Sequence, residues 1–178
     1  TQRCAKTLLQ TLRAHQHHAT HTNQPCHTHS KQQLLNALTT HTIQAWYQPQ
    51  YSLGQQTVVG VEALARWAHP QLGLLAPDTF LKDIERESLH EALLYSMLEQ
   101  SITAQKKWKI LGHSLRISVN LHTQLLDDLS LATRLFECVR DLGAYPASIC
   151  FELTEHSNTI NTSHYYSGAT RLRMKGFA

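Results

Sequence analysis

Residues 57–67 read TVVGVEALARW, a strand-like run followed by an acid. The run from Thr57 to Val61 is rich in β-branched residues, and such residues favour strands. Glu62 follows at once, although a carboxylate is poor core material. The stretch therefore predicts a strand with a candidate site residue at its end. Taken alone, a glutamate in this place can also serve as a salt-bridge partner or a helix cap.

Two further strand-like runs also end in a polar residue that carries oxygen. Residues 115–119 precede Asn120, and residues 148–151 precede Glu152. Three oxygen ligands at the ends of three strands are typical of a hard-metal site on a barrel of parallel strands. The intervening segments are long enough for helical returns, so Glu62, Asn120 and Glu152 can converge on one barrel face. Asn120 alone could instead satisfy backbone groups of a loop.

Strand-like and helix-like segments alternate from Ala45 onward. We expect strands at 45–51, 57–64, 115–121, 148–153 and from 176, and helices at 77–86, 90–109, 123–142 and 160–175. The short connection 52–56 contains Gly54 and predicts an antiparallel hairpin for the first two strands. Repeating strand–helix units indicate parallel β/α architecture with the helices outside. The predicted fold is the first half of a (β/α)8 TIM-like barrel with an antiparallel first strand pair, ending inside the fifth barrel strand.

The N-terminal region differs in composition from the rest of the chain. Residues 2–14 predict a short amphipathic helix, and residues 15–30 are polar and hold six of the 13 histidines. A further helix is predicted at 31–40. The expected division is a helix and histidine-rich linker over 1–30, followed by the barrel domain over 31–178. The linker could bind a transition metal, but no spacing matches a structural zinc site, which favours a polar tether.

Charge and cysteine content narrow the class of protein. The formal charge is +3, and the 16 Lys and Arg residues do not form the basic stripe that nucleic-acid binding requires, so we expect no DNA partner. The four cysteines form no CxxC pair, which favours a reducing cytoplasm. No apolar stretch approaches the roughly 18 residues of a membrane-spanning helix.

Four short motifs occur in a fixed order. They are YQPQY at 47–51, EALARW at 62–67, SVNL at 118–121 and FELTE at 151–155. Together they resemble the EAL domain family, the cyclic di-GMP phosphodiesterases, across about residues 32–178. The resemblance implies a (β/α)8 barrel that hydrolyses cyclic di-GMP to linear pGpG in bacterial second-messenger signalling. It also implies two bound Mg²⁺ or Mn²⁺ ions, a homodimer and an upstream sensor or receiver domain.

The resemblance also assigns roles to individual residues. The implied metal ligands are Glu62, Asn120 and Glu152, the loop-bracing residue is Glu155, and the substrate-binding residues are Gln48, Leu64 and Arg66. A planar guanidinium suits a substrate phosphate, and an amide can both donate to and accept from a guanine edge. Outside this motif, Arg66 could be a surface ion pair and Gln48 a polar group at a strand edge.

The sequence departs from the family pattern in two places. Ser88 stands where the family usually has a glycine, which loosens the end of a helix but touches no ligand. The chain also ends at Ala178, before the family's aspartate pair and its later lysine. We therefore expect the 178-residue chain alone to be inactive. The alternative function is a non-catalytic EAL-type receptor for cyclic di-GMP, or a protein-interaction module.

Overall fold

The computed structural model describes residues 28–154 and 162–178. Its strands are β1 (Ile43–Ser52), β2 (Thr57–His69), β3 (Gly73–Leu75), β4 (Arg116–His122) and β5 (Ile149–Thr154). Its helices are α2 (Lys31–Thr39), α3 (Leu81–Arg86), α4 (His90–Ile110), α5 (Leu131–Asp141) and α6 (Thr162–Met174), with 3-10 turns η1 (Pro77–Thr79), η2 (Thr123–Asp127) and η3 (Pro146–Ser148). The helix predicted at 2–14 and most of the histidine-rich linker lie outside the described residues.

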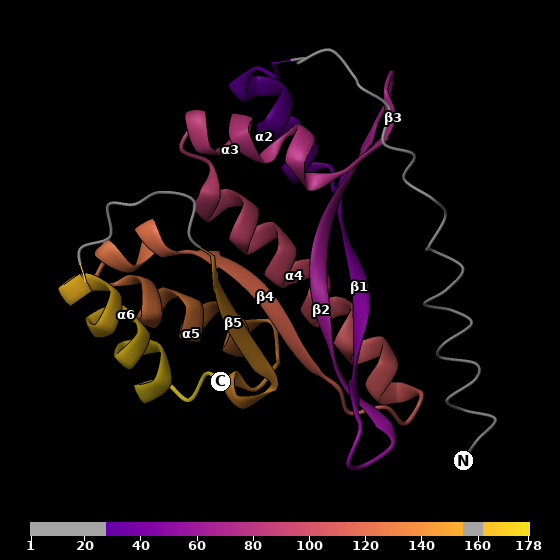
Figure 1. Cartoon of the computed structure of the whole chain (residues 1–178), viewed down its shortest axis with the longest axis vertical. Coiled ribbons are helices and arrows are strands. Elements are labelled where there is room, and N and C mark those ends of the chain that lie inside the picture. The colour runs from indigo at the N-terminus through magenta and orange to yellow at the C-terminus, as the bar shows by residue number, and fades with distance from the viewer. Residues whose placement is uncertain (1–27, 155–161) are drawn as a thin grey trace.

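The sheet has the strand order β1-β2-β4-β5, with the short β3 paired to β2. The strands β1 and β2 form an antiparallel hairpin, whereas β2, β4 and β5 run parallel. Figure 1 shows the hairpin standing beside β4 and β5, with α2 and α3 at its upper end and α5 and α6 beyond β5. The predicted α/β class and the antiparallel first strand pair are confirmed.

One face of the sheet is apolar and carries the main core. Because side chains alternate along a strand, every second residue of β2, β4 and β5 faces the same layer. These residues pack against α4 and α5 in one buried cluster, which includes Val61, Ala63, Ile117, Val119, Ile149, Phe151, Leu98, Ile102, Leu135 and Val139. Burying one such large aliphatic side chain contributes about 1.5–3 kcal/mol. This helical layer therefore supplies the stability that the polar opposite face cannot.

A second, smaller core explains why β2 is longer than the sequence predicts. The strand was expected over 57–64, but it continues to His69. Trp67 is 2% exposed and pairs with Ile43 on one side and Leu75 on the other. Leu34, Phe80 and Ile84 from the surrounding helices and turns close this core. Tertiary packing thus extends the strand beyond its most β-like residues.

Two helices predicted as single elements are divided in the structure. The segment 77–86 forms the turn η1 followed by α3, and the segment 123–142 forms η2 followed by α5. The second break lies at Asp128, whose backbone is extended and whose carboxylate accepts hydrogen bonds from the N–H and hydroxyl of Ser130. A local side-chain bond of this kind competes with helix formation.

His29 belongs to the packed domain, although in the sequence it stands at the end of the histidine-rich linker. Its ring is 4% exposed and lies 4.6 Å from the ring of Trp67. Its backbone N–H donates to Asp83 Oδ2 at 2.8 Å, and its Nδ1 lies 2.8 Å from the same oxygen. Arg86 completes the cluster by donating to the His29 carbonyl and to Asp83. This cluster ties the start of α2 to α3.

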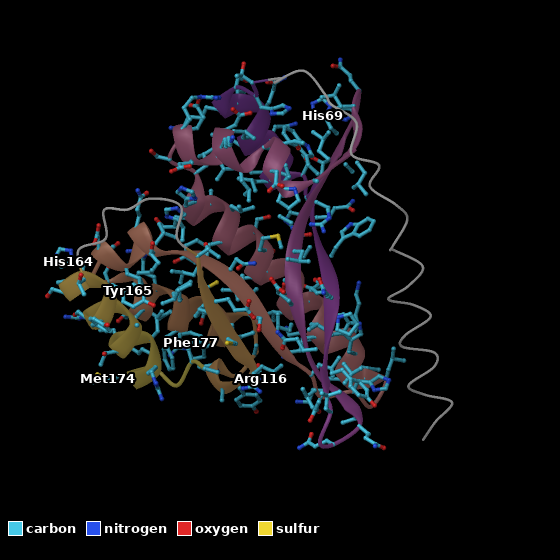
Figure 2. The ribbon with its side chains drawn as sticks, in the orientation of Figure 1. His69, Arg116, His164, Tyr165, Met174 and Phe177 are labelled. Atoms are coloured by element: carbon cyan, nitrogen blue, oxygen red, sulfur yellow. The ribbon has the colours of Figure 1, made fainter. Side chains whose placement is uncertain are left out.

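The two edges of the sheet differ. At the β1 edge, the N–H of Ala45 donates to Gln100 Oε1 and Gln100 Nε2 donates to the carbonyl of Ile43, both at 3.0 Å. At the β5 edge, Ala178 donates its N–H to Ile149 at 3.0 Å and accepts from Phe151 at 3.3 Å. This is the bonding of a parallel neighbour, and it fits the strand predicted from 176. Phe177 packs edge-on against Phe151, and Figure 2 shows it beside β5.

Candidate active site

Strand register places the three predicted metal ligands on one face of the sheet. Glu62 on β2 lies opposite Ser118 on β4, and Asn120, two residues further along, lies opposite Glu152 on β5. Because residues two apart on a strand share a face, all these side chains project from the side opposite the main core. The three candidate ligands are all half-buried. The parallel strands therefore bring them to one region, as the sequence predicts.

Direct contacts link the candidate ligands. The Nδ2 of Asn120 donates to Glu62 Oε1 at 3.3 Å, which leaves the oxygen of the same amide as a possible ligand. A second set of bonds holds Glu152: Gln50 on β1 donates its Nε2 to Glu152 Oε1 at 3.3 Å and to Ser118 Oγ at 3.2 Å. The site therefore contains two neighbouring hydrogen-bonded sets from four strands, and we call their residues together the row.

Gln50 was not predicted as a site residue, and its place depends on Gly60. The two residues are register partners in the β1–β2 hairpin. A Cβ at position 60 would lie 2.9 Å from Gln50 Oε1 and 2.9 Å from the carbonyl oxygen of Arg116. Only glycine leaves room for this approach, since real side chains do not pack that closely. A glycine inside a predicted strand is the one feature of the sequence that could have indicated this close approach of Gln50.

The predicted substrate residues lie beside the ligands on the same face. Gln48 is exposed and pairs with Glu62 across the hairpin. Leu64 and Arg66 follow Glu62 at steps of two, so all three share one face of β2. Both Leu64 and Arg66 are half-buried.

Arg66 is held close to the strand. Its Nη1 donates to the carbonyl of Ala65 at 2.8 Å. Burial lowers the pKa of the Arg66 guanidinium, while the Asp78 carboxylate acts in the opposite direction. A guanidinium stays protonated despite such a shift, so Arg66 offers a permanent positive charge at the edge of the row.

The donor set suits a hard divalent cation. Mg²⁺ takes oxygen ligands and keeps several waters, so it needs only a few protein groups. Two carboxylates and one amide oxygen, from Glu62, Glu152 and Asn120, meet this requirement. Within 28–154 and 162–178, no cluster of three or more His, Cys, Asp or Glu side chains has the geometry of a metal site. Glu155, the predicted loop-bracing residue, lies outside the described residues.

Two histidines adjoin the row, and neither was predicted. His122, two residues after Asn120, stacks on His90 with ring centroids 3.9 Å apart and an interplanar angle of 15°. The Nδ1 of His122 also accepts from the N–H of Gln124 at 3.4 Å. The stack joins the start of α4 to the end of β4 and so supports the strand end that carries Asn120.

A family comparison agrees with this geometry. The model of the EAL domain matches residues 31–178. The chain belongs to the EAL domain family. The EAL match therefore covers the hairpin, the three parallel strands and the row of candidate ligands.

Relatives of this EAL domain are known from sequence and structure. Cyclic di-GMP phosphodiesterase RocR of Pseudomonas aeruginosa is 31% identical over 133 residues, which are 75% of this chain and 34% of the relative. Cyclic di-GMP phosphodiesterase NbdA of the same organism is 29% identical over 147 residues, or 82% of this chain and 19% of the relative. The solved PaMucR phosphodiesterase, in complex with c-di-GMP, has a TM-score of 0.73 at 26% identity and aligns with 82% of this chain and 59% of that one. This chain thus spans about a third of RocR and less of NbdA.

Proposed function

We propose that this chain is the N-terminal part of a metal-dependent phosphodiesterase that hydrolyses cyclic di-GMP to linear pGpG. The observation that carries the proposal is the row of Glu62, Asn120 and Glu152, two of them hydrogen-bonded to each other and the third held by Gln50. Family membership and relatives named as cyclic di-GMP phosphodiesterases support the substrate class. We propose that this activity serves bacterial second-messenger signalling in the cytoplasm.

Three residues of the row would bind the metal ions. Glu62, Asn120 and Glu152 would hold Mg²⁺ or Mn²⁺ through oxygen atoms. When bound, such ions lower the pKa of the attacking water and neutralise charge on the phosphate. Gln50 keeps the Glu152 carboxylate turned into the row, and Asn120 does the same for Glu62. These contacts orient the carboxylates before any ion binds.

Substrate recognition falls to the neighbouring side chains. Arg66 would bind a phosphate of cyclic di-GMP through its guanidinium, and Gln48 would bond a guanine edge through its amide. The backbone around Leu64 would line the same pocket. Glu155 would brace a loop that orders the metal site. By family resemblance, the whole protein would act as a homodimer under an upstream sensor or receiver domain.

Hydrolysis by the natural full-length protein tests the proposal. We expect linear pGpG to form from cyclic di-GMP with Mg²⁺ or Mn²⁺, and Glu62→Gln to lower the rate at least about 100-fold, since even residues that support metal ligands cost about 10–100-fold when changed. Chromatography of the products measures this. The matched control is Glu137→Gln, which neutralises an exposed carboxylate on α5 and should leave the rate unchanged.

Two results would contradict the enzyme. Absence of pGpG with the unaltered protein would exclude hydrolysis, and retained binding of cyclic di-GMP would then assign the protein to the receptor class. Loss of activity in Glu137→Gln equal to that in Glu62→Gln would show that the effect is not specific to the row.

A further inference from the structure

The N-terminal ends of the parallel strands, opposite the candidate active site, form a basic concave surface. Lys106 and Lys109 on α4, Arg116 at the start of β4 and Tyr145 line a pocket of about 350 Å³ there. None of its lining residues is an aspartate or glutamate. Figure 1 shows α4 ending at this end of the sheet near the β1–β2 turn, and Figure 2 shows Arg116 at its lower edge.

Among the described residues, no carboxylate pairs with the cations of this surface. Residues 100–126 contain no aspartate or glutamate. Within the described ranges, none of Lys106, Lys109 and Arg116 forms an ion pair with a carboxylate. By contrast, Arg86 and Arg134 each contact two carboxylates. Unpaired cations around a concavity raise the local potential and attract an anionic partner.

Exposed apolar side chains adjoin these cations. Ile110 at the end of α4 is 86% exposed, and Leu111 is 67% exposed. Ile110 follows Lys106 by four residues, so the two lie on one face of the helix. Tyr145 is 72% exposed, and the Nζ of Lys109 lies 5.8 Å from its ring centroid. We call Lys106, Lys109, Ile110, Leu111, Arg116 and Tyr145 the basal surface.

We propose that the basal surface docks on an anionic lipid bilayer. Its cations complement acidic headgroups, each adding about a fivefold gain in binding. Its neighbouring aliphatic side chains can enter the boundary between headgroups and acyl chains, where apolar burial adds to the electrostatic attraction. Tyrosine is enriched at that depth because its ring is apolar and its hydroxyl is polar.

The apolar component favours a bilayer over other anionic partners. A nucleic acid offers phosphates and stacking bases, which suit cations and aromatic rings but give Ile110 and Leu111 no apolar surroundings. Along β4, Arg116 lies two residues before Ser118 and four before Asn120, so docking through the N-terminal strand ends approaches the row from below without covering its Asn120 side. The proposal is therefore independent of the catalytic one.

Vesicle co-sedimentation of the full-length protein, at near-physiological salt, tests the proposal. We expect binding to vesicles of phosphatidylcholine with a quarter phosphatidylglycerol, little binding to pure phosphatidylcholine, and weaker binding at higher salt. The triple variant Lys106→Gln/Lys109→Gln/Arg116→Gln should lose about 100-fold in partitioning. The double variant Ile110→Ser/Leu111→Ser should bind more weakly than the parent, and its remaining binding should keep the salt dependence.

Matched variants elsewhere on the surface serve as controls. Lys31→Gln/Lys82→Gln/Arg173→Gln removes three exposed cations, and Leu129→Ser/Met174→Ser removes two exposed apolar side chains near α5 and α6. Both should bind like the parent, and circular dichroism verifies that every variant is folded. Equal binding by neutral vesicles, no binding at all, or equal losses in the control variants would overturn the proposal. So would tighter binding of RNA or polyglutamate that is indifferent to Ile110 and Leu111.

Discussion

Gln50 shows how one amide can hold a carboxylate of the candidate site. Its Nε2 contacts both Glu152 and Ser118, and the absence of a side chain at Gly60 permits the approach. We expect Gln50→Leu, a change of similar size, to weaken Mn²⁺ binding by about 10–100-fold, because Glu152 loses the partner that orients it. Titration of Mn²⁺ by electron paramagnetic resonance measures this without any need for turnover.

The conservative variant separates positioning from packing. Gln50→Glu keeps the shape of the side chain but places a second negative charge beside Glu152. If Gln50 acts on the site through its polar group, the Mn²⁺ affinity of this variant should differ from that of Gln50→Leu, while the two variants have equal stability. Gln55→Leu, at an exposed site in the hairpin turn, is the control. Unchanged Mn²⁺ affinity in Gln50→Leu would show that Gln50 is only a packing residue.

At the residue level, the sequence predicted which side chains share a face of the sheet, but not which residues lie opposite one another in the hairpin. Glu62, Asn120 and Glu152 share one face, as expected, but they lie within β2, β4 and β5 and not at the predicted strand ends, because each strand continues beyond them. Gln50 could not be placed, because its importance arises from lying opposite Gly60 in the hairpin. The hairpin itself was predicted, but its register was not, because the pairing shifts by a bulge between Gln50 and Tyr51.

At the scale of elements, the end of α3 shows how a serine in place of the family's usual glycine at position 88 lowers stability. Ser88 has a φ of 55°, and the Leu89 N–H donates to the Ile84 carbonyl at 2.8 Å, the six-residue loop of a Schellman motif. The left-handed conformation costs an L-residue about 1–2 kcal/mol. We expect Ser88→Gly to stabilise the protein by about 1 kcal/mol and to raise the Tm by about 3 °C. Calorimetry measures the gain, and Ser88→Ala, which keeps the strain, should show none.

The cluster that joins α2 to α3 should make stability depend on pH. Burial alone would raise the pKa of Asp83, but hydrogen bonds from the His29 backbone and ring and from Arg86 lower it below its usual value. The folded state therefore favours the ionised carboxylate. Its contribution is complete above the pKa of the unfolded chain, about 3.9, and is lost as the pH falls through the lower pKa of the folded state.

Replacing the carboxylate tests this contribution. Asp83→Asn should lower the free energy of unfolding by about 2–3 kcal/mol at pH 7, because the Arg86 charge and the His29 groups lose their acceptor. The deficit should be smaller at pH 3, because below about 3.9 the unfolded chain takes up a proton that the folded carboxylate resists. Urea denaturation at both pH values measures it, with the exposed Glu85→Gln as control. A deficit that is the same at both pH values would argue against the ionic contribution.

Helices and strands were predicted well where the spacing of apolar residues within one segment was enough to identify them. The hairpin, the parallel strands β4 and β5 and the long helix α4 match their expected ranges closely. The extension of β2 to His69 was missed because it depends on Trp67 packing between Ile43 and Leu75. The break before α5 was missed because apolar spacing is the same on both sides of Asp128.

On the scale of the whole molecule, different kinds of residue lie toward the two ends of the parallel strands. The row of candidate ligands lies toward one end, and the uncompensated cations of the basal surface lie at the other. No helix in the described part of the chain is long and apolar enough to cross a bilayer. Docking of the basal surface on a bilayer would turn the ligand row toward the solvent.

The two edges of the sheet differ in how readily they can pair with a further strand. Along β1, the Gln100 amide occupies the outward hydrogen-bonding groups of Ile43 and Ala45, and Pro49 has no N–H to offer. Along β5, Ala178 already makes both bonds of a parallel neighbour. A polypeptide added to this molecule, whether covalently attached or supplied as a separate piece, would be templated from the β5 side. At the opposite edge, a further strand would have to displace the Gln100 side chain from Ile43 and Ala45 before it could pair there.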